Sequence, residues 1–230
     1  MFVSAVTGSF AQVRALVFDL DGTLIDSKLD LALAVNATLV ASGRTELAHD
    51  RIFGYVGKGA LRLVERAMGD GSRPEEIDNA HRFFLSYYRE HMLDNTTLYP
   101  GVCECLEALQ SRPMAVLTNK PWRFSREILE GLGIARYFRE IRGGNSFETK
   151  KPDPFGMLAI LSVFGVEPNR AMLVGDSDVD VQTARNAGAW ACGVSYGFGA
   201  ESLKNCPPDI LLDNLTELLA YLGAPSITQS

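Results

Sequence analysis

The sequence predicts an α/β fold, a Rossmann-like parallel sheet core with an inserted all-helical cap domain. Two observations lead to this prediction. Short apolar runs that are typical of buried strands alternate with segments of helical period over most of the chain, and such alternation produces a parallel sheet covered by helices on both faces. Between residues 28 and 95 the apolar residues follow only helical periods, which indicates a small helical bundle inserted after the first strand.

The first strand is expected over residues 13–20 (VRALVFDL), where β-branched and apolar residues precede an acidic turn. The helix that follows it is expected to end near Gly43. Two shorter helices are expected on either side of a turn at 57–59, and Pro74 opens another helix at the position that proline favours. The residues expected to share one face of the first helix are Leu29, Leu33, Asn36 and Val40. The inner face expected for the last helix comprises Ile77, Ala80, Phe84, Tyr87 and His91.

Strands and helices are expected to alternate again after the helical segment. The expected strands are 114–118, 171–175, 191–195 and 209–212. The expected helices are 101–110, 124–132, 155–164 and 216–221, with one more ending near residue 188. The predicted organisation is an N-terminal extension (1–12), an α/β core (13–27 and 96–230) and a helical cap (28–95). Open sheets of this kind bind ligands beyond the carboxyl ends of their strands, where the cap is expected to lie.

The composition argues against several classes of protein. The chain has 230 residues and a net charge of −6, from 22 basic and 28 acidic side chains, whereas nucleic-acid binders usually carry a basic patch. No apolar run has the length of a membrane span, and the N-terminus lacks the basic start of a signal peptide. The four cysteines follow no metal or disulfide pattern. We therefore expect a cytoplasmic protein, a monomer or a homodimer, that binds neither nucleic acid nor membranes.

The residues that carry chemistry begin with two acids, Asp19 and Asp21, at the end of the first expected strand. Two carboxylates at the exit of a buried strand are costly to bury without a counter-charge. A hard cation such as Mg²⁺ would hold them through oxygen ligands and leave room for a substrate phosphate. One carboxylate could then act as nucleophile and the other as general acid and base. The alternative is an ordinary turn rich in Asp and Gly.

Three further motifs lie where expected strands end or expected helices begin. Thr118 and Asn119 offer a hydroxyl and an amide to phosphate oxygens, although this pair also suits a helix N-cap. Lys151 offers a positive charge ahead of a helix, where a solvated surface lysine would be the alternative. Asp176 and Asp180 place acids between a strand and a helix, a position that helix capping also favours. Taken together and in this order, the motifs form a specific set.

The whole set resembles the haloacid dehalogenase-like phosphohydrolases over residues 13 to about 222. The stretches that match the four motifs of that family in order are Asp19-x-Asp21-Gly22-Thr23, Thr118, Lys151 and Gly175-Asp176-x-x-x-Asp180. A closer resemblance is to the phosphoglycolate phosphatase-like branch. The stretches that carry it are VGKGA (56–60), YPGV (99–102), LTNKP (117–121), GGNSF (143–147) and KPDP (151–154). The position of the insert implies a helical cap of the type found in such members.

The resemblance implies a magnesium-dependent phosphatase that forms a phospho-aspartate. Asp19 would attack phosphorus in line and become phosphorylated. Asp21 would protonate the leaving oxygen and then take a proton from the water that hydrolyses the intermediate. Mg²⁺ would be held by Asp19, the backbone carbonyl of Asp21 and Asp176. The expected substrate is a small phosphorylated metabolite, 2-phosphoglycolate, which would give glycolate and phosphate.

The resemblance also implies how the phosphoryl group is held. Thr118, Asn119 and Lys151 would bind its oxygens, and Asp180 would support the site from its edge. The count of charges agrees with this assignment, because a phosphate dianion beside three carboxylates needs about three compensating positive charges. Mg²⁺ together with Lys151 would supply them.

Several other functions remain open from the sequence alone. Sugar-phosphate phosphatases, pyrophosphatases and β-phosphoglucomutase-like phosphomutases share much of this framework. A binding module without activity is a further alternative, although the matched acids and Lys151 argue against it.

The cap is expected to recognise the leaving group of the substrate. The four motifs account for the phosphoryl group, the nucleophile and the metal, and they leave no core residue assigned to the rest of the ester. Lys58, in the turn between two cap helices, and Arg62, one helical turn on, could hold a carboxylate together with backbone N–H groups. The alternative is that both side chains are solvated surface charges.

Overall fold

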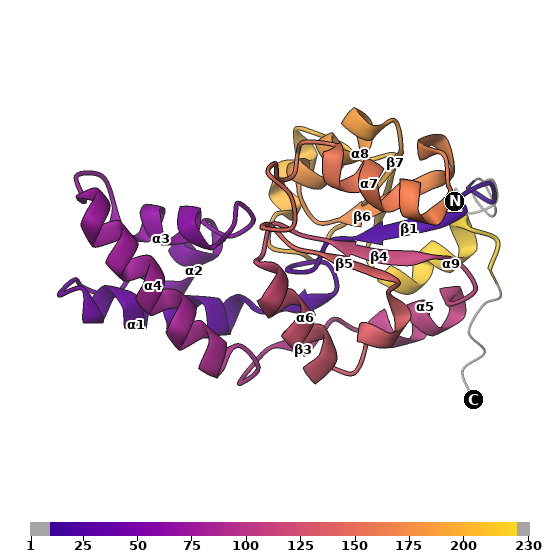
Figure 1. Ribbon diagram of the computed structural model, residues 1–230. Helices are drawn as coiled ribbons and strands as arrows, with labels where there is room; N and C mark the ends of the chain where they lie inside the picture. The colour runs from indigo at the N-terminus through magenta and orange to yellow at the C-terminus, as the bar shows by residue number, and fades with distance from the viewer. Residues whose placement is uncertain (1–9, 225–230) are drawn as a thin grey trace.

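The computed structural model describes residues 10–224, which contain a six-stranded sheet (Figure 1). The strand order is β5-β4-β1-β6-β7-β8. The strands are β1 (Ala15–Phe18), β4 (Met114–Leu117), β5 (Glu140–Arg142), β6 (Ala171–Gly175), β7 (Trp190–Val194) and β8 (Ile210–Leu212). Every neighbouring pair is parallel. The predicted Rossmann-like core is therefore confirmed.

Helices cover both faces of the sheet (Figure 1). Leu16 and Phe18 of β1 pack in the core on the side of α5, α6 and α9, whereas Ala15 and Val17 pack on the side of α7 and α8. These helices are α5 (Val102–Leu109), α6 (Trp122–Gly131), α7 (Phe155–Phe164), α8 (Asp178–Ala187) and α9 (Leu218–Tyr221). Short 3₁₀ helices span Ala135–Tyr137, Pro168–Arg170, Ala200–Lys204 and Leu215–Glu217. Burial of β1 on both faces explains why its sequence is apolar without alternation.

The edge strand β5 was not predicted. It has three half-buried residues, and the charged Glu140 and Arg142 flank its one apolar residue. A strand at the edge of a sheet has a partner on one side only, so its sequence need not be apolar. β5 nevertheless bears on the site, because the backbone carbonyl of Arg142 accepts a hydrogen bond of 3.0 Å from the backbone N–H of Thr118.

Four helices form a separate bundle beside the sheet domain (Figure 1). They are α1 (Lys28–Ala41), α2 (His49–Phe53), α3 (Ala60–Met68) and α4 (Pro74–His91). The two chain segments that join the bundle to the sheet domain pair with each other as the antiparallel strands β2 (Ile25–Asp26) and β3 (Thr97–Leu98). Within residues 10–224 no helix is both long and apolar enough to cross a membrane.

The helical faces of the bundle differ in part from those predicted. On α1 the side chains of Leu29, Leu33 and Val40 are exposed, and only Asn36 of the predicted face is buried. On α4 Ala80 and Phe84 are buried as predicted, whereas Ile77, Tyr87 and His91 are half-buried. The residues that complete the buried faces are Leu31, Val35 and Leu39 on α1 and Tyr88 on α4. Both helices carry apolar residues on more than one side, so periodicity alone did not select the buried side.

One residue of the predicted N-terminal extension, Phe10, packs into the sheet domain. Residues 1–9 lie outside the described part of the chain, but Phe10 is buried. Its ring meets Trp190 edge-on, with 5.0 Å between the ring centroids, and also lies against Tyr221. Phe10 therefore belongs to the core of the sheet domain. The sequence around it has no strand or helix period, so its burial depends on distant residues.

Asp30 connects the two segments that join the helical bundle to the sheet domain. Its buried carboxylate lies on the first turn of α1 and accepts hydrogen bonds from the chain just after α4. The donors are the backbone N–H of Asn95 (3.0 Å), the backbone N–H of Thr96 (2.9 Å), the Thr96 hydroxyl (2.7 Å) and the Asn95 amide (2.8 Å). The Asp30 side chain therefore holds together the two chain segments that join the bundle to the sheet domain.

Replacing this carboxylate is expected to destabilise the protein strongly. Asp30→Ala leaves the buried donors of Thr96 without their acceptor, which should cost about 3 kcal/mol. For a chain of this size that corresponds to a fall in Tm of roughly 6–12 °C, measurable by calorimetry. The exposed Asp70 provides the control. A Tm for Asp30→Ala equal to that of Asp70→Ala would contradict the role given to Asp30.

Candidate active site

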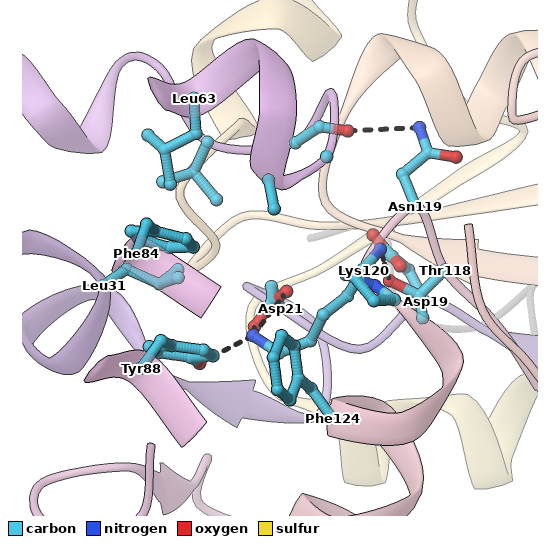
Figure 2. Close-up of a pocket in the computed structure, with 15 residues that line it drawn as sticks. Asp19, Asp21, Leu31, Leu63, Phe84, Tyr88, Thr118, Asn119, Lys120 and Phe124 are labelled. Carbon is cyan, nitrogen blue, oxygen red and sulfur yellow. Dashed lines mark hydrogen bonds and ion pairs between the residues drawn. The ribbon is translucent and has the colours of Figure 1, made fainter. Parts of the chain in front are cut away.

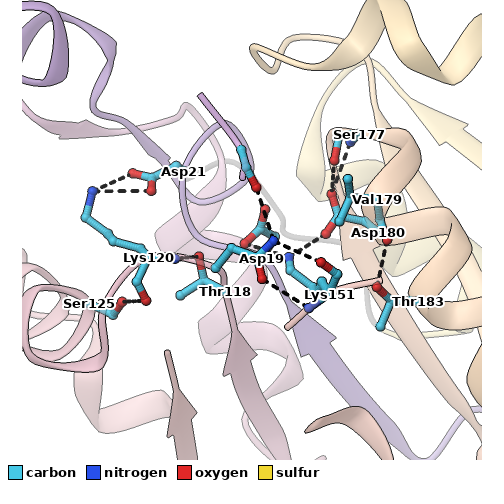
Figure 3. Close-up of polar contacts among 12 residues, drawn as sticks. Asp19, Asp21, Thr118, Lys120, Ser125, Lys151, Ser177, Val179, Asp180 and Thr183 are labelled. Carbon is cyan, nitrogen blue, oxygen red and sulfur yellow. Dashed lines mark hydrogen bonds and ion pairs between the residues drawn. The ribbon is translucent and has the colours of Figure 1, made fainter. Parts of the chain in front are cut away.

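The matched motifs meet at the carboxyl ends of the central strands (Figure 3). Asp19 follows β1, Thr118 follows β4 and Asp176 follows β6, while Lys151 precedes α7. All four side chains are buried. β1 lies between β4 and β6 in the sheet, so its end is central, and the backbone N–H of Asp19 donates to the Val174 carbonyl of β6 at 2.9 Å.

Lys151 neutralises part of the acidic charge. Its ammonium lies 2.9 Å from Oδ1 of Asp19 and 2.5 Å from Oδ1 of Asp180. Burial by itself would lower the pKa of Lys151, but the Asp180 and Asp19 carboxylates together raise that pKa above its usual value, so the side chain is a cation. Burial raises the pKa of Asp19 to about 6, although Lys151 opposes this effect. Asp19 is therefore a carboxylate at neutral pH.

Three acids form a cluster that one cation does not balance. Carboxylate oxygens of Asp19, Asp176 and Asp180 lie within 4.8 Å of one another. Burial raises the pKa of Asp176 well above its usual value, and the charges of Asp180 and Asp19 add to the effect. Asp180 also accepts hydrogen bonds from the backbone N–H (3.1 Å) and hydroxyl (2.7 Å) of Ser177, so it caps α8 as well. A divalent metal ion would relieve the remaining repulsion.

The backbone around Asp176 leaves space for its carboxylate, as a metal site at this residue would require. Gly22 has a φ of +83°, and a Cβ there would lie 2.1 Å from Oδ2 of Asp176. A Cβ at Gly197 would lie 2.2 Å from the Asp176 Cβ. The backbone N–H of Gly199 donates to Oδ2 of Asp176 at 2.8 Å. The absence of side chains at Gly22 and Gly197 therefore makes space for the Asp176 carboxylate, and the N–H of Gly199 orients it.

The crowded carboxylates should destabilise the metal-free protein. A folded-state pKa above the unfolded value gives stability that is present at low pH and is lost as the pH rises through the folded pKa. In EDTA at pH 7, Asp176→Asn should therefore have a higher Tm than the unsubstituted protein, and the difference should shrink as the pH falls to 5. Mg²⁺ should raise the Tm of the unsubstituted protein by more than it raises that of Asp176→Asn. The matched control is Asp178→Asn, and a lower Tm for Asp176→Asn in EDTA would contradict this account.

Asp21 has different partners from the other acids. Oδ1 of Asp21 lies 3.0 Å from Nζ of Lys120 and accepts a hydrogen bond of 2.5 Å from the Ser27 hydroxyl. Nζ of Lys120 also donates to the Tyr88 hydroxyl at 2.7 Å. Figure 3 shows Asp21 with Lys120 on one side of Asp19, and Asp180 with Lys151 on the other. The acid cluster thus contains the Asp19, Asp176 and Asp180 side chains but not the Asp21 side chain.

No role was predicted for Lys120 from the sequence. Its side chain is only 4% exposed. Burial would lower the pKa of Lys120, but the Asp21 carboxylate and the Tyr88 hydroxyl together raise that pKa above its usual value, so Lys120 is a second buried cation. Its importance could have been inferred from its position directly after Thr118 and Asn119, because this stretch already matched the family.

Asn119 positions Lys151 and contacts the helical bundle. Its amide oxygen accepts a hydrogen bond of 3.1 Å from the backbone N–H of Lys151. Its amide nitrogen lies 3.2 Å from the carbonyls of both Lys151 and Gly57. In this structure the amide therefore holds the chain that carries Lys151 and touches the turn between α2 and α3. The predicted contact of Asn119 with phosphate stays a prediction.

A cavity opens between the sheet domain and the helical bundle, directly beside the acids (Figure 2). Its free volume is about 40 Å³, room for roughly three water molecules. Its polar lining consists of Asp19, Asp21, Tyr88, Thr118, Asn119 and Lys120, and apolar residues that include Leu31, Leu63, Phe84 and Phe124 complete it. Lys58 and Arg62 do not line it. Both are exposed, and Arg62 pairs with Glu65 at 2.8 Å.

The model of one protein family, the haloacid dehalogenase-like hydrolases, matches residues 16–194. The chain belongs to this family. The match extends from β1 through β7 and includes all four motifs. The resemblance stated from the motifs is thereby confirmed.

Relatives of this chain match it over most of their length. Phosphoglycolate phosphatase of Escherichia coli (strain K12) is 34% identical, over 94% of this chain and 95% of the relative. Phosphoglycolate phosphatase 1 of Pseudomonas aeruginosa is 38% identical, over 90% of this chain and 78% of the relative. The crystal structure of a predicted phosphoglycolate phosphatase from Haemophilus somnus 129PT superposes with a TM-score of 0.86 at 33% identity, covering 90% of this chain and 97% of that one.

Proposed function

We propose that this protein is a magnesium-dependent phosphatase that hydrolyses 2-phosphoglycolate to glycolate and phosphate. The observation that carries the proposal is the arrangement of Asp19, a buried carboxylate at the end of β1 with Lys151 2.9 Å away and two further acids beside it. The names of the relatives support the substrate, since proteins 34% and 38% identical to this one are phosphoglycolate phosphatases.

The reaction proceeds in two displacements at phosphorus. In the first, an Asp19 carboxylate oxygen forms a bond to phosphorus, the bond from phosphorus to the ester oxygen breaks, and Asp21 gives its proton to that oxygen. In the second, Asp21 takes a proton from water as the water oxygen attacks phosphorus, and Asp19 is released. Asp19 is thus the nucleophile and Asp21 the general acid and base.

The remaining residues bind and position the transferred group. Lys151 and Thr118 hold phosphoryl oxygens, and Asn119 keeps the backbone of Lys151 in place through the 3.1 Å hydrogen bond. Asp180 positions the Lys151 ammonium, which it contacts at 2.5 Å. Fixed charges that are arranged before the reaction stabilise the charge that develops in the transition state.

Mg²⁺ is the metal that we assign to the acid cluster. Asp19 and Asp176 would hold it with the backbone carbonyl of Asp21, because oxygen ligands from a few carboxylates suit this ion. When bound, it would supply the positive charge that lets a phosphate dianion approach three carboxylates. The fit is supported by the glycines that leave space around Asp176 and by the repulsion within the cluster.

The α1–α4 bundle acts as a cap that covers the site. Its residues line the outer side of the cavity, and a covered site excludes water from the first displacement. We place the protein in the cytoplasm, where the four free cysteines would stay reduced. Its state as a monomer or a homodimer stays a prediction.

Phosphate release from a panel of small esters tests the proposal. With Mg²⁺ present, we expect kcat/KM for 2-phosphoglycolate to exceed the values for ethyl phosphate, glucose 6-phosphate and pyrophosphate by at least about tenfold, since the cavity is small and contains a cation beside Asp21. A higher kcat/KM for a sugar phosphate or for pyrophosphate would assign the enzyme to one of the other branches. Conversion of one sugar phosphate into its isomer would indicate a phosphomutase.

A further inference from the structure

The side of the cavity next to Asp21 contains one buried cation. Lys120 is the only Lys or Arg among the residues that line this cavity, and its side chain is 4% exposed. Asp21 and Tyr88 contact it, and the other cavity residues around it include the apolar Leu31, Phe84 and Phe124. In such surroundings an ammonium is a strong partner for an anionic group that enters the cavity.

We propose that the Lys120 ammonium binds the carboxylate of the leaving group, and that Lys120 is thereby the residue that selects a phosphorylated acid. This inference rests on the proposed function and adds to it the group that recognises the part of the substrate remaining after phosphoryl transfer. The sequence suggested that Lys58 and Arg62 bind the carboxylate, but both lie outside the cavity. The proposal assigns this role to Lys120 instead.

The distances match a carboxylate placed two bonds from the ester oxygen. Asp21 must approach the leaving oxygen to about 2.8 Å to protonate it, and Nζ of Lys120 lies 3.0 Å from the same carboxylate. The ammonium is therefore within roughly 6 Å of the leaving oxygen. In a phosphorylated 2-hydroxy acid the carboxylate oxygens are about 3 Å from the ester oxygen, and one hydrogen bond of about 3 Å spans the rest.

The second lysine of the site, Lys151, contacts other acids than Lys120 does. Lys151 contacts Asp19 and Asp180 on the opposite side of Asp19 from Lys120 (Figure 3). Lys151 binds the transferred phosphoryl group, so the two lysines bind different parts of the substrate. Such a division allows the phosphate and the carboxylate of a small phosphorylated acid each to meet its own cation.

Tyr88 fixes the position of Lys120 from the cap. Its hydroxyl accepts a hydrogen bond of 2.7 Å from Nζ (Figure 2), and the Tyr88 ring is buried against Phe84 and Phe124. An ammonium has three donors, and Nζ of Lys120 contacts both carboxylate oxygens of Asp21 (3.0 and 3.2 Å) and the Tyr88 hydroxyl (2.7 Å). A substrate carboxylate would take over one of the two hydrogen bonds to Asp21, which would keep the other.

Two substrates and one variant of similar size distinguish binding of the carboxylate by Lys120 from an effect of Lys120 on Asp21 alone. We would measure kcat/KM for 2-phosphoglycolate and for ethyl phosphate, which has a methyl group in place of the carboxylate. In Lys120→Met the preference for 2-phosphoglycolate should fall roughly 10- to 100-fold, the contribution of a hydrogen bond to a charged group. Lys58→Ala and Arg62→Ala should keep the preference. An equal loss with both substrates in Lys120→Met would overturn the proposal, as would collapse of the preference in Lys58→Ala or Arg62→Ala.

A binding measurement keeps the test decisive if Lys120→Met does not fold. The double variant Asp21→Asn/Lys120→Met leaves no unpaired buried charge, and its matched control is Asp21→Asn. Calorimetry should show a weaker Kd for 2-phosphoglycolate in the double variant, roughly 10-fold or more, with the Kd for ethyl phosphate unchanged. Equal changes for both ligands would overturn the proposal. Absence of any preference in the unsubstituted enzyme would instead refute the substrate assigned under the proposed function.

Discussion

Asp19→Asn is expected to lower kcat by at least ~10³-fold, as other removals of a catalytic nucleophile do. An amide is not an effective nucleophile toward phosphorus, and none of the neighbouring acids lies in the same position at the end of β1. The fold should persist, because burial already raises the pKa of Asp19 to about 6 and so favours its neutral form. The measurement is phosphate release with Mg²⁺ and 2-phosphoglycolate, together with Tm.

The matched control for this variant is Asp70→Asn, which makes the same change at an exposed acid of the helical bundle. It should keep the full kcat. If folded Asp19→Asn retained more than about a tenth of the unsubstituted kcat, another group would have to be the nucleophile, because nucleophile removal costs far more than that.

Removal of divalent metal is expected to abolish activity. Without a cation, a phosphate dianion would meet the buried acids Asp19, Asp176 and Asp180 with Lys151 as the adjacent positive charge. Excess EDTA should reduce phosphate release to background, and Mg²⁺ should restore it. Ca²⁺ should restore little, because it favours a larger and looser set of ligands than Mg²⁺.

The control is Asp178→Asn, which changes a half-exposed acid of α8 outside the cluster and should keep the Mg²⁺ dependence of the unsubstituted enzyme. Asp176→Asn should need far more Mg²⁺ for half-maximal rate. Full activity of a metal-stripped sample would contradict the metal assignment and would favour a metal-independent hydrolase of the same family.

Much of this site could be predicted because its residues follow strands. A buried strand has a clear apolar signature, and in a parallel sheet the ends of neighbouring strands lie side by side. Asp19, Thr118 and Asp176 each follow such a run, so local sequence was enough to place them together. Lys151 follows no strand, and the order of the family motifs identified it.

The other features depend on contacts that no local pattern encodes. The role of Lys120 depends on Tyr88 and Asp21, which are distant in the sequence. Burial of Phe10 depends on Trp190 in the same way. The buried side of α1 was missed because the helix is apolar around most of its circumference, so that the choice of side is made by packing against α4.

Lys58 and Arg62 illustrate a further limit of sequence reasoning. Their charges and their turn between helices fit an anion site equally well whether the side chains point into the cavity or into solvent. The structure places both on the surface and puts Lys120 beside Asp21 instead. A prediction of which cation meets the substrate therefore required the three-dimensional arrangement of the helical bundle and the sheet domain.

The most direct test of the account is to locate the phosphoryl group during turnover. The enzyme would be mixed with Mg²⁺ and 2-phosphoglycolate and quenched in acid within milliseconds, and its peptides would be analysed by mass spectrometry. We predict one added phosphoryl group on Asp19, which disappears as the substrate is consumed and which is absent from Asp19→Asn. Rapid turnover with no phosphoryl group on Asp19 at any time, or with the group on another residue, would contradict the proposed mechanism.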